Sequence, residues 1–370
     1  MNTERTLFPA DEAREAAPPL PRTERLLLIL AGLFLTANCT ALTVLRPALG
    51  WRIWLHFGVW AACAAAGHWW LQRRLPARDQ LLFPVSMLLS GWGLLVIGRL
   101  LPQFADRQAL WLAMGTAALA LAAGFPHALR WLRSYRYVIL ILGLTLLVAT
   151  ILLGRNPSGQ EGAPALWLGV GVLFVQPSEI MKILLVAFLA TYLAEQFPVL
   201  SAEIRSGGRA WHAFSPRIVG PILLMWGLSL VILVWQRDLG TAGLFFIVFL
   251  LLLYVASGSL VILVSGALLG ITAVFAAYNL FSVVQLRVDI WLNPWPESAG
   301  RAYQIVQSLM AFAAGGVFGQ GIGQGLPGYV PVVHSDFVFA AIGEEWGLLG
   351  IVAVIASVAA LFVRGLRSAL

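Results

Sequence analysis

The sequence is poor in charge and in cysteine. Charged residues make up 11% of the 370 residues, whereas hydrophobic residues make up 60%. Soluble globular proteins carry roughly a quarter charged residues, so this composition excludes an ordinary soluble domain. The two cysteines, Cys39 and Cys63, both lie within apolar stretches, which excludes a disulfide framework and a cysteine-based metal cluster.

Three further features are missing. No P-loop glycine motif occurs, so we expect no bound nucleotide. The polar segment 1–24 has mixed charge and no cleavage site after it, which excludes a cleaved signal peptide and indicates a disordered cytoplasmic tail. No long polar linker divides the rest, so we predict that residues 25–370 form a single integral membrane domain. The net charge of +7 does not indicate nucleic-acid binding, because arginine excess in a membrane protein marks its cytoplasmic loops.

Long apolar runs are the main feature that is present. Mean hydropathy is +0.85, and a run of about 20 apolar residues spans the ~30 Å hydrocarbon core of a bilayer. We therefore predict an all-α, polytopic helical membrane protein with about 8–10 transmembrane segments. The predicted spans are residues 25–45, 52–71, 80–101, 109–125, 137–153, 177–197, 217–236, 239–257, 260–280 and 337–363.

Arginine placement predicts the orientation of these spans. Arginines near membrane segments are retained on the cytoplasmic side. They gather between alternate spans and after the last one, at Arg73, Arg74, Arg78, Arg130, Arg133, Arg136, Arg205, Arg209, Arg364 and Arg367. We therefore predict a cytoplasmic N-terminus and two segments on the other side, residues 154–176 and a large extracytoplasmic loop at 281–336.

The segment from Arg287 to Gly350 is polar and rich in glycine. We expect it to lie outside the hydrocarbon or to line a wet cavity, because lipid cannot satisfy its backbone groups. Its dense glycines favour unusual backbone conformations or close approach of another chain or ligand. Because this segment is predicted outside and no nucleotide motif occurs, an activated substrate would have to arrive attached to lipid.

His334, Ser335 and Asp336 stand directly before the last predicted span. Asp336 is either the N-cap of that span or a functional carboxylate, which acts as a general base or binds a cation. Glu344 and Glu345 lie about two turns deeper. Acidic side chains at that depth are costly unless they face a polar interior.

Two more polar sites interrupt apolar stretches. Pro177 fits the first turn of a helix, and Glu179 and the single lysine of the chain, Lys182, stand three residues apart on one face of it. This pair is either a salt bridge at a capped helix entrance or a contact for a substrate or ion. Asp238 lies between two apolar runs, either as a capping residue or as a polar node that supports a nearby active site.

Five motifs, in this order, resemble the SEDS family, which contains proteins of the RodA, FtsW and SpoVE types. They are Phe-Val-Gln-Pro-Ser-Glu at 174–179, Gln-Arg-Asp-Leu-Gly-Thr at 236–241, Trp-Leu-Asn-Pro-Trp at 291–295, Tyr-Gln-Ile-Val-Gln-Ser at 303–308, and His-Ser-Asp-Phe at 334–337 with Glu-Glu at 344–345. The resemblance implies a peptidoglycan glycosyltransferase. Such enzymes polymerise lipid II into glycan strands at the outer face of the bacterial cytoplasmic membrane, in cell elongation or division.

The resemblance also implies roles for individual residues. Asp336 is expected to be catalytic, as a base for the acceptor sugar hydroxyl, either alone or with a divalent cation (Mg²⁺ or Mn²⁺). Asp238 and Glu345 are expected to support the site. The implied partners are the membrane, lipid II and a class B penicillin-binding protein transpeptidase. The residues expected to bind substrate are Glu179, Lys182, Arg287, Asn293, Gln304, Gln307, His334 and Glu344.

Two other functions remain open, a lipid II translocator (flippase) and a non-catalytic scaffold for a transpeptidase. An outward carboxylate required for polymerisation favours the glycosyltransferase, whereas charges required along an inward-to-outward path favour the translocator. The family continues beyond the span that ends near Phe362, whereas this sequence stops at Leu370. We therefore expect the chain to lack the family's C-terminal membrane segments, which keeps the scaffold alternative open.

Overall fold

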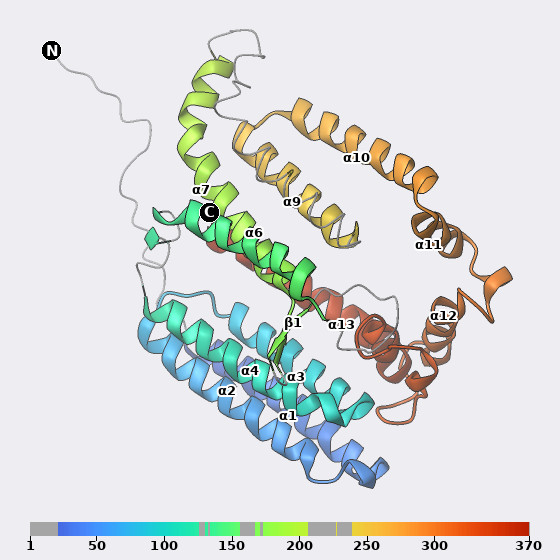
Figure 1. The fold of residues 1–370 in the computed structure, drawn as a ribbon. Helices are drawn as coiled ribbons and strands as arrows, with labels where there is room; N and C mark the ends of the chain where they lie inside the picture. The colour runs from blue at the N-terminus through green and yellow to red at the C-terminus, as the bar shows by residue number, and fades with distance from the viewer. Residues whose placement is uncertain are drawn as a thin grey trace. The chain divides into compact units, whose positions relative to one another are not determined.

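The computed structural model describes residues 21–125, 130, 131, 134–155, 167–170, 173–205, 227 and 239–369. In this part the chain forms eleven α-helices and one two-stranded antiparallel sheet (Figure 1). The predicted class, an all-α polytopic membrane protein, is therefore confirmed. Six described helices are long and apolar enough to cross a membrane, at Thr23–Leu45, Leu82–Leu100, Pro177–Glu195, Gly240–Ser257, Leu260–Leu280 and Val338–Ser368.

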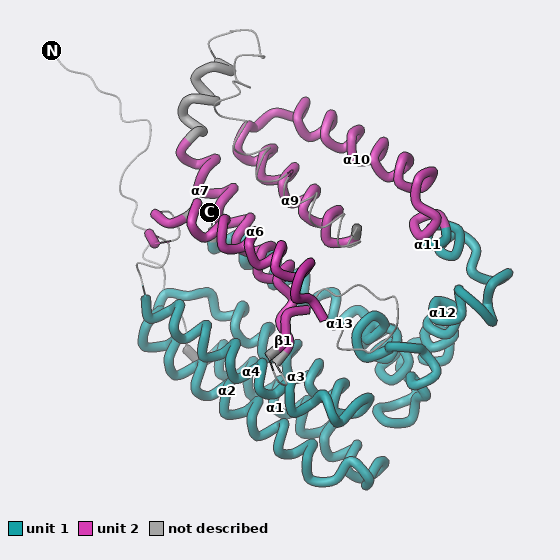
Figure 2. The backbone as a smooth tube through the Cα atoms, viewed as in Figure 1, with its two compact units in different colours: residues 1–126, 286–370 teal, residues 127–285 magenta. Residues whose placement is uncertain are grey.

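The chain divides into two compact units (Figure 2). Unit 1 comprises residues 1–126 and 286–370, and unit 2 comprises residues 127–285. The prediction of a single membrane domain over residues 25–370 stays a prediction, because this division does not show whether either unit folds alone.

Unit 1 contains four helices before the point where the chain leaves it and two long helices after the chain returns. They are α1 (Pro21–Leu45), α2 (Arg52–Arg74), α3 (Leu82–Leu100), α4 (Pro102–Gly124), α12 (Tyr303–Gly315) and α13 (Val338–Ala369). The helix α1 begins three residues before the predicted end of the polar tail, and Glu24 within it is buried. The tail residues 1–20 lie outside the described residues.

Close packing of large side chains against small residues holds α1, α2 and α3 together. Trp60 is buried and donates its Nε1–H to the carbonyl of Met87 over 2.8 Å. A Cβ atom at Gly91 would overlap the side chains of Leu35 and Trp60. The glycine is therefore required by the approach of the helices, since interiors leave no room for an added methyl group.

Charged residues gather at one end of unit 1, which we call the Glu24 end. Glu24 Oε1 lies 2.7 Å from Arg78 Nη2 and 2.7 Å from His68 Nδ1. Asp79 Oδ2 lies 2.6 Å from Arg364 Nη2, near the end of α13. The start of α1, the chain after α2 and the end of α13 therefore share one side of unit 1. Arginine counting predicted this shared side, while its assignment to the cytoplasm stays a prediction.

Unit 2 packs its helices around a core of aliphatic and aromatic side chains. Leu140, Leu147, Met181, Phe188 and Phe245 are almost completely buried in it. A hairpin lies in the predicted segment 154–176, which the all-α prediction did not foresee. Apart from residue 227, the predicted span 217–236 lies outside the described residues. The elements are α6 (Arg136–Leu153), β1 (Leu168–Val170), β2 (Leu173–Val175), α7 (Pro177–Arg205), α9 (Leu239–Ser257) and α10 (Leu260–Leu280).

The segment 281–336, predicted as a large extracytoplasmic loop, is mostly helical. The helix α11 (Ser282–Leu292) runs across the boundary of the two units. It is followed by the 3₁₀ helix η2 (Trp295–Glu297), by α12 and by the 3₁₀ helix η3 (Pro327–Tyr329). Helices supply their own backbone hydrogen bonds, so the helical parts of this segment satisfy their own polar backbone groups.

Candidate functional site

Asp336 lies on an exposed turn immediately before α13. Its N–H donates to the carbonyl of Val332 over 3.2 Å, and the Ser335 hydroxyl lies 3.2 Å from Asp336 Oδ1. Within the described residues the carboxylate forms no ion pair. A carboxylate that is exposed, oriented by a neighbour and free of a cation suits a proton acceptor.

The start of α13 bears on the alternative reading of Asp336 as an N-cap. The first helical residue is Val338, so the N-cap position belongs to Phe337. The carbonyl of Phe337 accepts the N–H groups of Ala340 over 2.9 Å and Ala341 over 3.3 Å, as an N-cap carbonyl does. The Asp336 side chain is therefore one residue too early to cap this helix.

The half-buried ring of His334 packs against Phe104, near the start of α4. The ring centroids lie 5.5 Å apart with an interplanar angle of 37°. The resemblance implies that His334 binds substrate, and that role stays a prediction. The described contact ties the chain before α13 to α4.

The glutamines of α12 also lie beside this turn. Gln304 Nε2 donates to the carbonyl of Pro331 over 2.8 Å, five residues before Asp336. Gln307 lies one turn further along the same helix and is half-buried. The sequence predicted both as substrate contacts. The structure gives Gln304 a contact with the backbone of the turn, while its contact with substrate stays a prediction.

Glu344 and Glu345 are buried and hold the glycine-rich loop that follows α12. Glu344 Oε1 accepts the N–H of Leu326 over 2.8 Å, and Glu345 Oε1 accepts the N–H of Gly323 over 3.0 Å. Glu345 Oε1 also lies 3.2 Å from Arg99 Nε. The polar groups around the two carboxylates are thus backbone N–H groups of the loop and the side chain of Arg99. The predicted contact of Glu344 with substrate stays a prediction.

Gly315 and Gly319 are needed because the chain there lies directly on the backbone of α13. A Cβ atom at Gly319 (φ 83°) would overlap the carbonyl of Glu345, and one at Gly315 would overlap the carbonyl of Gly343. The helix itself is kinked at Gly347, where φ is 66°. The dense glycines predicted close approach of another chain or ligand. The segment that approaches them is α13 of the same chain.

Two arginines that sequence reasoning missed complete this region. Arg46, just after α1, donates Nε–H to the carbonyl of Gly323 over 2.9 Å. Arg99, in the last turn of α3, donates Nη2–H to the carbonyl of Gly325 over 3.1 Å. Arg46 follows the first predicted span and Arg99 lies near the end of the third, on the side of the membrane where arginine is rare because arginines are retained in the cytoplasm. The presence of arginines on this side was therefore the signal in the sequence that could have indicated this region. We call this end, where Arg46, Arg99 and Glu345 meet, the Glu345 end.

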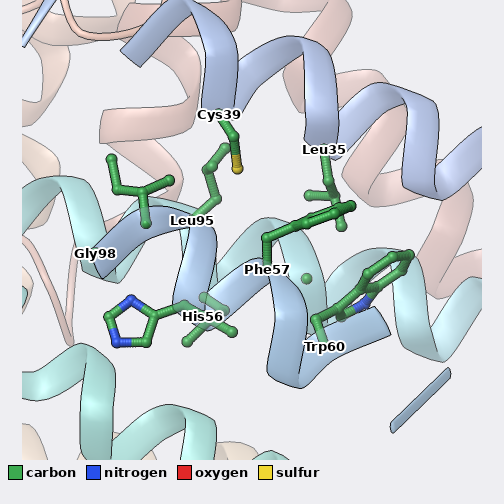
Figure 3. A pocket seen from close by; sticks show the side chains of 10 residues that line it. Leu35, Cys39, His56, Phe57, Trp60, Leu95 and Gly98 are labelled. Atoms are coloured by element: carbon green, nitrogen blue, oxygen red, sulfur yellow. The ribbon is translucent and has the colours of Figure 1, made fainter. Parts of the chain in front are cut away.

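A small cavity lies between α1, α2 and α3 of unit 1 (Figure 3). Its volume is about 20 Å³, which is room for about one water molecule. Leu35, Cys39, Phe57 and Trp60 make it apolar, and His56 is its titratable polar group besides the thiol. His56 Nε2 lies 2.8 Å from Asp106 Oδ1. The cavity is too small for a sugar, so it is part of the packing and does not hold substrate.

In unit 2, α7 begins at Pro177, as its sequence predicted. Lys182 Nζ lies 2.6 Å from Glu179 Oε2, so the predicted pairing three residues apart is confirmed. The Lys182 side chain is 29% exposed and that of Glu179 is 58% exposed, so the pair is open to an anionic group. Asp336 belongs to unit 1, and a site shared by all three residues stays a prediction.

The remaining predicted residues lie on or after α11. Arg287 and Asn293 are exposed, as are Trp291 and Trp295 beside them. Asp238 lies outside the described residues. The predicted roles of these residues in substrate binding and support stay predictions.

The residues around Asp336 were tested against a divalent cation. Among the described residues there is no group of three or more His, Cys, Asp or Glu side chains that could hold a metal ion. His334, the nearest imidazole in sequence, packs on Phe104. Because Mg²⁺ and Mn²⁺ require several oxygen ligands, these side chains do not by themselves form such a site. The predicted cation stays a prediction.

Comparison with known proteins identifies the family. Residues 81–370 match the family model FTSW_RODA_SPOVE, described as "Cell cycle protein". The chain is 34% identical to peptidoglycan glycosyltransferase RodA of Mycobacterium tuberculosis, over 95% of this chain and 78% of the relative. It is 31% identical to the probable peptidoglycan glycosyltransferase FtsW of Tolumonas auensis, over 79% and 74% respectively.

The solved structures similar to this chain include one from work described as "Structural coordination of polymerization and crosslinking by a peptidoglycan synthase complex". The identity is 25% and the TM-score 0.48, and the match covers 84% of this chain and 76% of the other. The family match spans well over half of the sequence and includes the motifs after residue 81. The chain therefore belongs to the FtsW, RodA and SpoVE family of cell cycle proteins.

Proposed function

We propose that this protein is a peptidoglycan glycosyltransferase that polymerises lipid II into glycan strands at the outer face of the cytoplasmic membrane. Its family membership supports this, because the RodA and FtsW relatives are named for that activity. The structural observation that supports it most directly is Asp336, an exposed carboxylate on a tethered turn at the Glu345 end of unit 1.

Asp336 is the proposed general base. It would accept the proton of the acceptor sugar hydroxyl while the hydroxyl oxygen forms a bond to the anomeric carbon of the donor. The bond from that carbon to the diphosphate oxygen breaks, and undecaprenyl diphosphate leaves with its electron pair. A positioned base contributes about 10²–10⁴-fold to rate, so its removal should dominate the activity.

Lys182 and Glu179 are proposed to bind the donor. A lysine ammonium is a compact charge that suits a diphosphate, and Lys182 lies partly exposed at the start of α7, paired with Glu179. Glu179 would orient the ammonium until substrate arrives. Arg287, Asn293 and Gln307 are proposed as further contacts to lipid II.

Two features of the proposal concern the surroundings of the protein. The N-terminus is proposed to be cytoplasmic, which puts the Glu24 end inside and the Glu345 end outside. A class B penicillin-binding protein is the proposed transpeptidase partner, because glycan strands must be crosslinked after they are made. A divalent cation at Asp336 would have to take most of its ligands from substrate and water.

The test is polymerisation of purified lipid II by the protein reconstituted in vesicles. Asp336→Asn keeps the shape of the side chain and removes its basicity, so we expect a rate loss of at least about 100-fold. Glu297→Gln is the matched control, since Glu297 is an exposed carboxylate of the same segment, and it should polymerise at the parental rate. Parental activity of Asp336→Asn would refute the proposed role.

A further inference from the structure

The direction of the Asp336 carboxylate depends on the turn that carries it. Within the described residues, Ser335 is the only side chain that contacts the carboxylate, at 3.2 Å, and both residues belong to the same turn. Among the described residues no basic side chain forms an ion pair with Asp336, and the N-cap position of α13 belongs to Phe337. The position of Asp336 therefore follows from whatever holds the backbone of residues 331–336.

That backbone is strained at Val332. Its φ of 53° lies in the left-handed region, and among the described residues it is the single non-glycine residue with a positive φ. A β-branched side chain is disfavoured there, at a cost on the order of 1–3 kcal/mol. The Val332 carbonyl accepts the N–H groups of Ser335 and Asp336, at 3.1 and 3.2 Å. This conformation therefore directs Asp336 and needs support from outside the turn.

Two side chains from distant helices supply contacts on either side of Val332. Gln304 of α12 donates to the carbonyl of Pro331, the residue before it, over 2.8 Å. Phe104 of α4 packs on the ring of His334, two residues after it, at 5.5 Å. Neither Gln304 nor Phe104 has a described contact with Asp336 itself. The two contacts thus hold the backbone before and after Val332.

The apolar side chains of the same segment fix its depth. Val330 and Val333 are buried in a cluster with Ala311 of α12 and with Ala340 and Ala341 of α13. These contacts are non-directional and do not select a rotation of the turn. The hydrogen bond from Gln304 and the ring contact of Phe104 are directional, so they are the interactions that can set the angle at which Asp336 is presented.

We infer that Gln304 and Phe104 are positioning residues for Asp336. They hold the 331–336 turn in its strained conformation, so that the carboxylate meets the acceptor hydroxyl in a productive geometry. The inference rests on the proposed function, and it assigns Gln304 a role other than direct contact with substrate. Misplacement of a reacting group by about 1 Å costs on the order of 100-fold in rate, so loss of either contact should lower kcat.

The decisive variant at the first residue is Gln304→Glu, which keeps the size of the side chain and replaces its N–H donor with an acceptor. In lipid II polymerisation we expect kcat to fall about tenfold to a hundredfold, with KM within about twofold of the parent. Gln304→Lys restores a donor and should recover part of kcat. Gln103→Glu, an exposed glutamine on α4, is the matched control and should behave as the parent.

At Phe104, Phe104→Leu removes the ring that His334 packs on and should lower kcat, whereas Phe104→Tyr keeps the ring and should not. The thermal midpoint of every variant is measured. A general folding defect would lower that midpoint equally in Phe104→Leu, Phe104→Tyr and Gln304→Glu. A rise in KM with unchanged kcat in Gln304→Glu would show direct substrate binding and overturn the inference.

The proposed function and this inference fail in different ways. If Asp336→Asn polymerises normally, the role of Asp336 is wrong whatever Gln304 does. If Asp336→Asn is inactive while Gln304→Glu and Phe104→Leu keep parental kcat, the base assignment stands and the positioning role is wrong.

Discussion

Three glycines of the loop after α12 should respond to substitution by alanine in a graded order. At Gly328 a Cβ would meet nothing within 4 Å, and its φ is not positive. At Gly316 the space is equally open, but φ is 52°. At Gly319 φ is 83°, and a Cβ would overlap the backbone of Glu345. The series therefore separates added volume, backbone strain and direct overlap.

The magnitudes follow from these three geometries. Gly328→Ala should change the free energy of unfolding by no more than about 0.5 kcal/mol. Gly316→Ala should cost about 1–2 kcal/mol, because an L side chain in the left-handed region is strained. Gly319→Ala should cost that amount plus about 1–3 kcal/mol for overlap with backbone that cannot move aside.

The assay is thermal unfolding of the purified protein in one detergent at one scan rate. For a unit of about 200 residues, 1 kcal/mol shifts the midpoint by roughly 2–4 °C, so the three variants should be resolved. Equal loss in Gly316→Ala and Gly319→Ala would show that the loop is not pressed against α13. Equal loss in Gly328→Ala would show that any side chain in the loop is harmful, and would refute the geometric reasoning.

Two further predictions concern the Glu24 end and the orientation. Burial alone would raise the pKa of Asp79, but hydrogen bonds from the Leu81 N–H and from Arg364, with the charge of Arg364, outweigh it and hold that pKa below its usual value of 3.8. The ionised carboxylate of Asp79 therefore stabilises the fold fully at pH values above its pKa in the unfolded chain. That stabilisation is lost as the pH falls through its lower pKa in the folded protein. The thermal midpoint should drop more steeply below about pH 4 in the parent than in Asp79→Asn, and parallel curves would contradict this. In a background without the native cysteines, Ser298→Cys should react in intact cells with a membrane-impermeant thiol reagent, whereas Arg74→Cys should be protected. The reverse pattern would put Asp336 in the cytoplasm.

The sequence alone determined the class of the protein and most of its helices. In hydrocarbon only a helix satisfies the backbone of a single apolar run, so run length predicts helices directly. The predicted span 260–280 matches α10, and α7 begins at the proline that predicted it. The pair of Glu179 and Lys182 was also predictable, because both residues lie on one turn of one helix.

Contacts between segments far apart in the chain were decided by tertiary structure. Arg99 and Gly325 are separated by 226 positions, and no local pattern indicates that they meet. Residues 281–336 were predicted as a loop without its short helices, since the apolar runs of these helices are brief and their ends depend on packing.

The candidate site shows the same division. The motif of His334 and Asp336 was visible in the sequence, and so was the type of chemistry that a carboxylate offers there. The anchoring of its turn by Gln304 and Phe104 was not, because a hydrogen bond and a ring contact across helices depend on distance in space. Sequence therefore determined which residues are present for chemistry, and the packing of the helices decided how they are held.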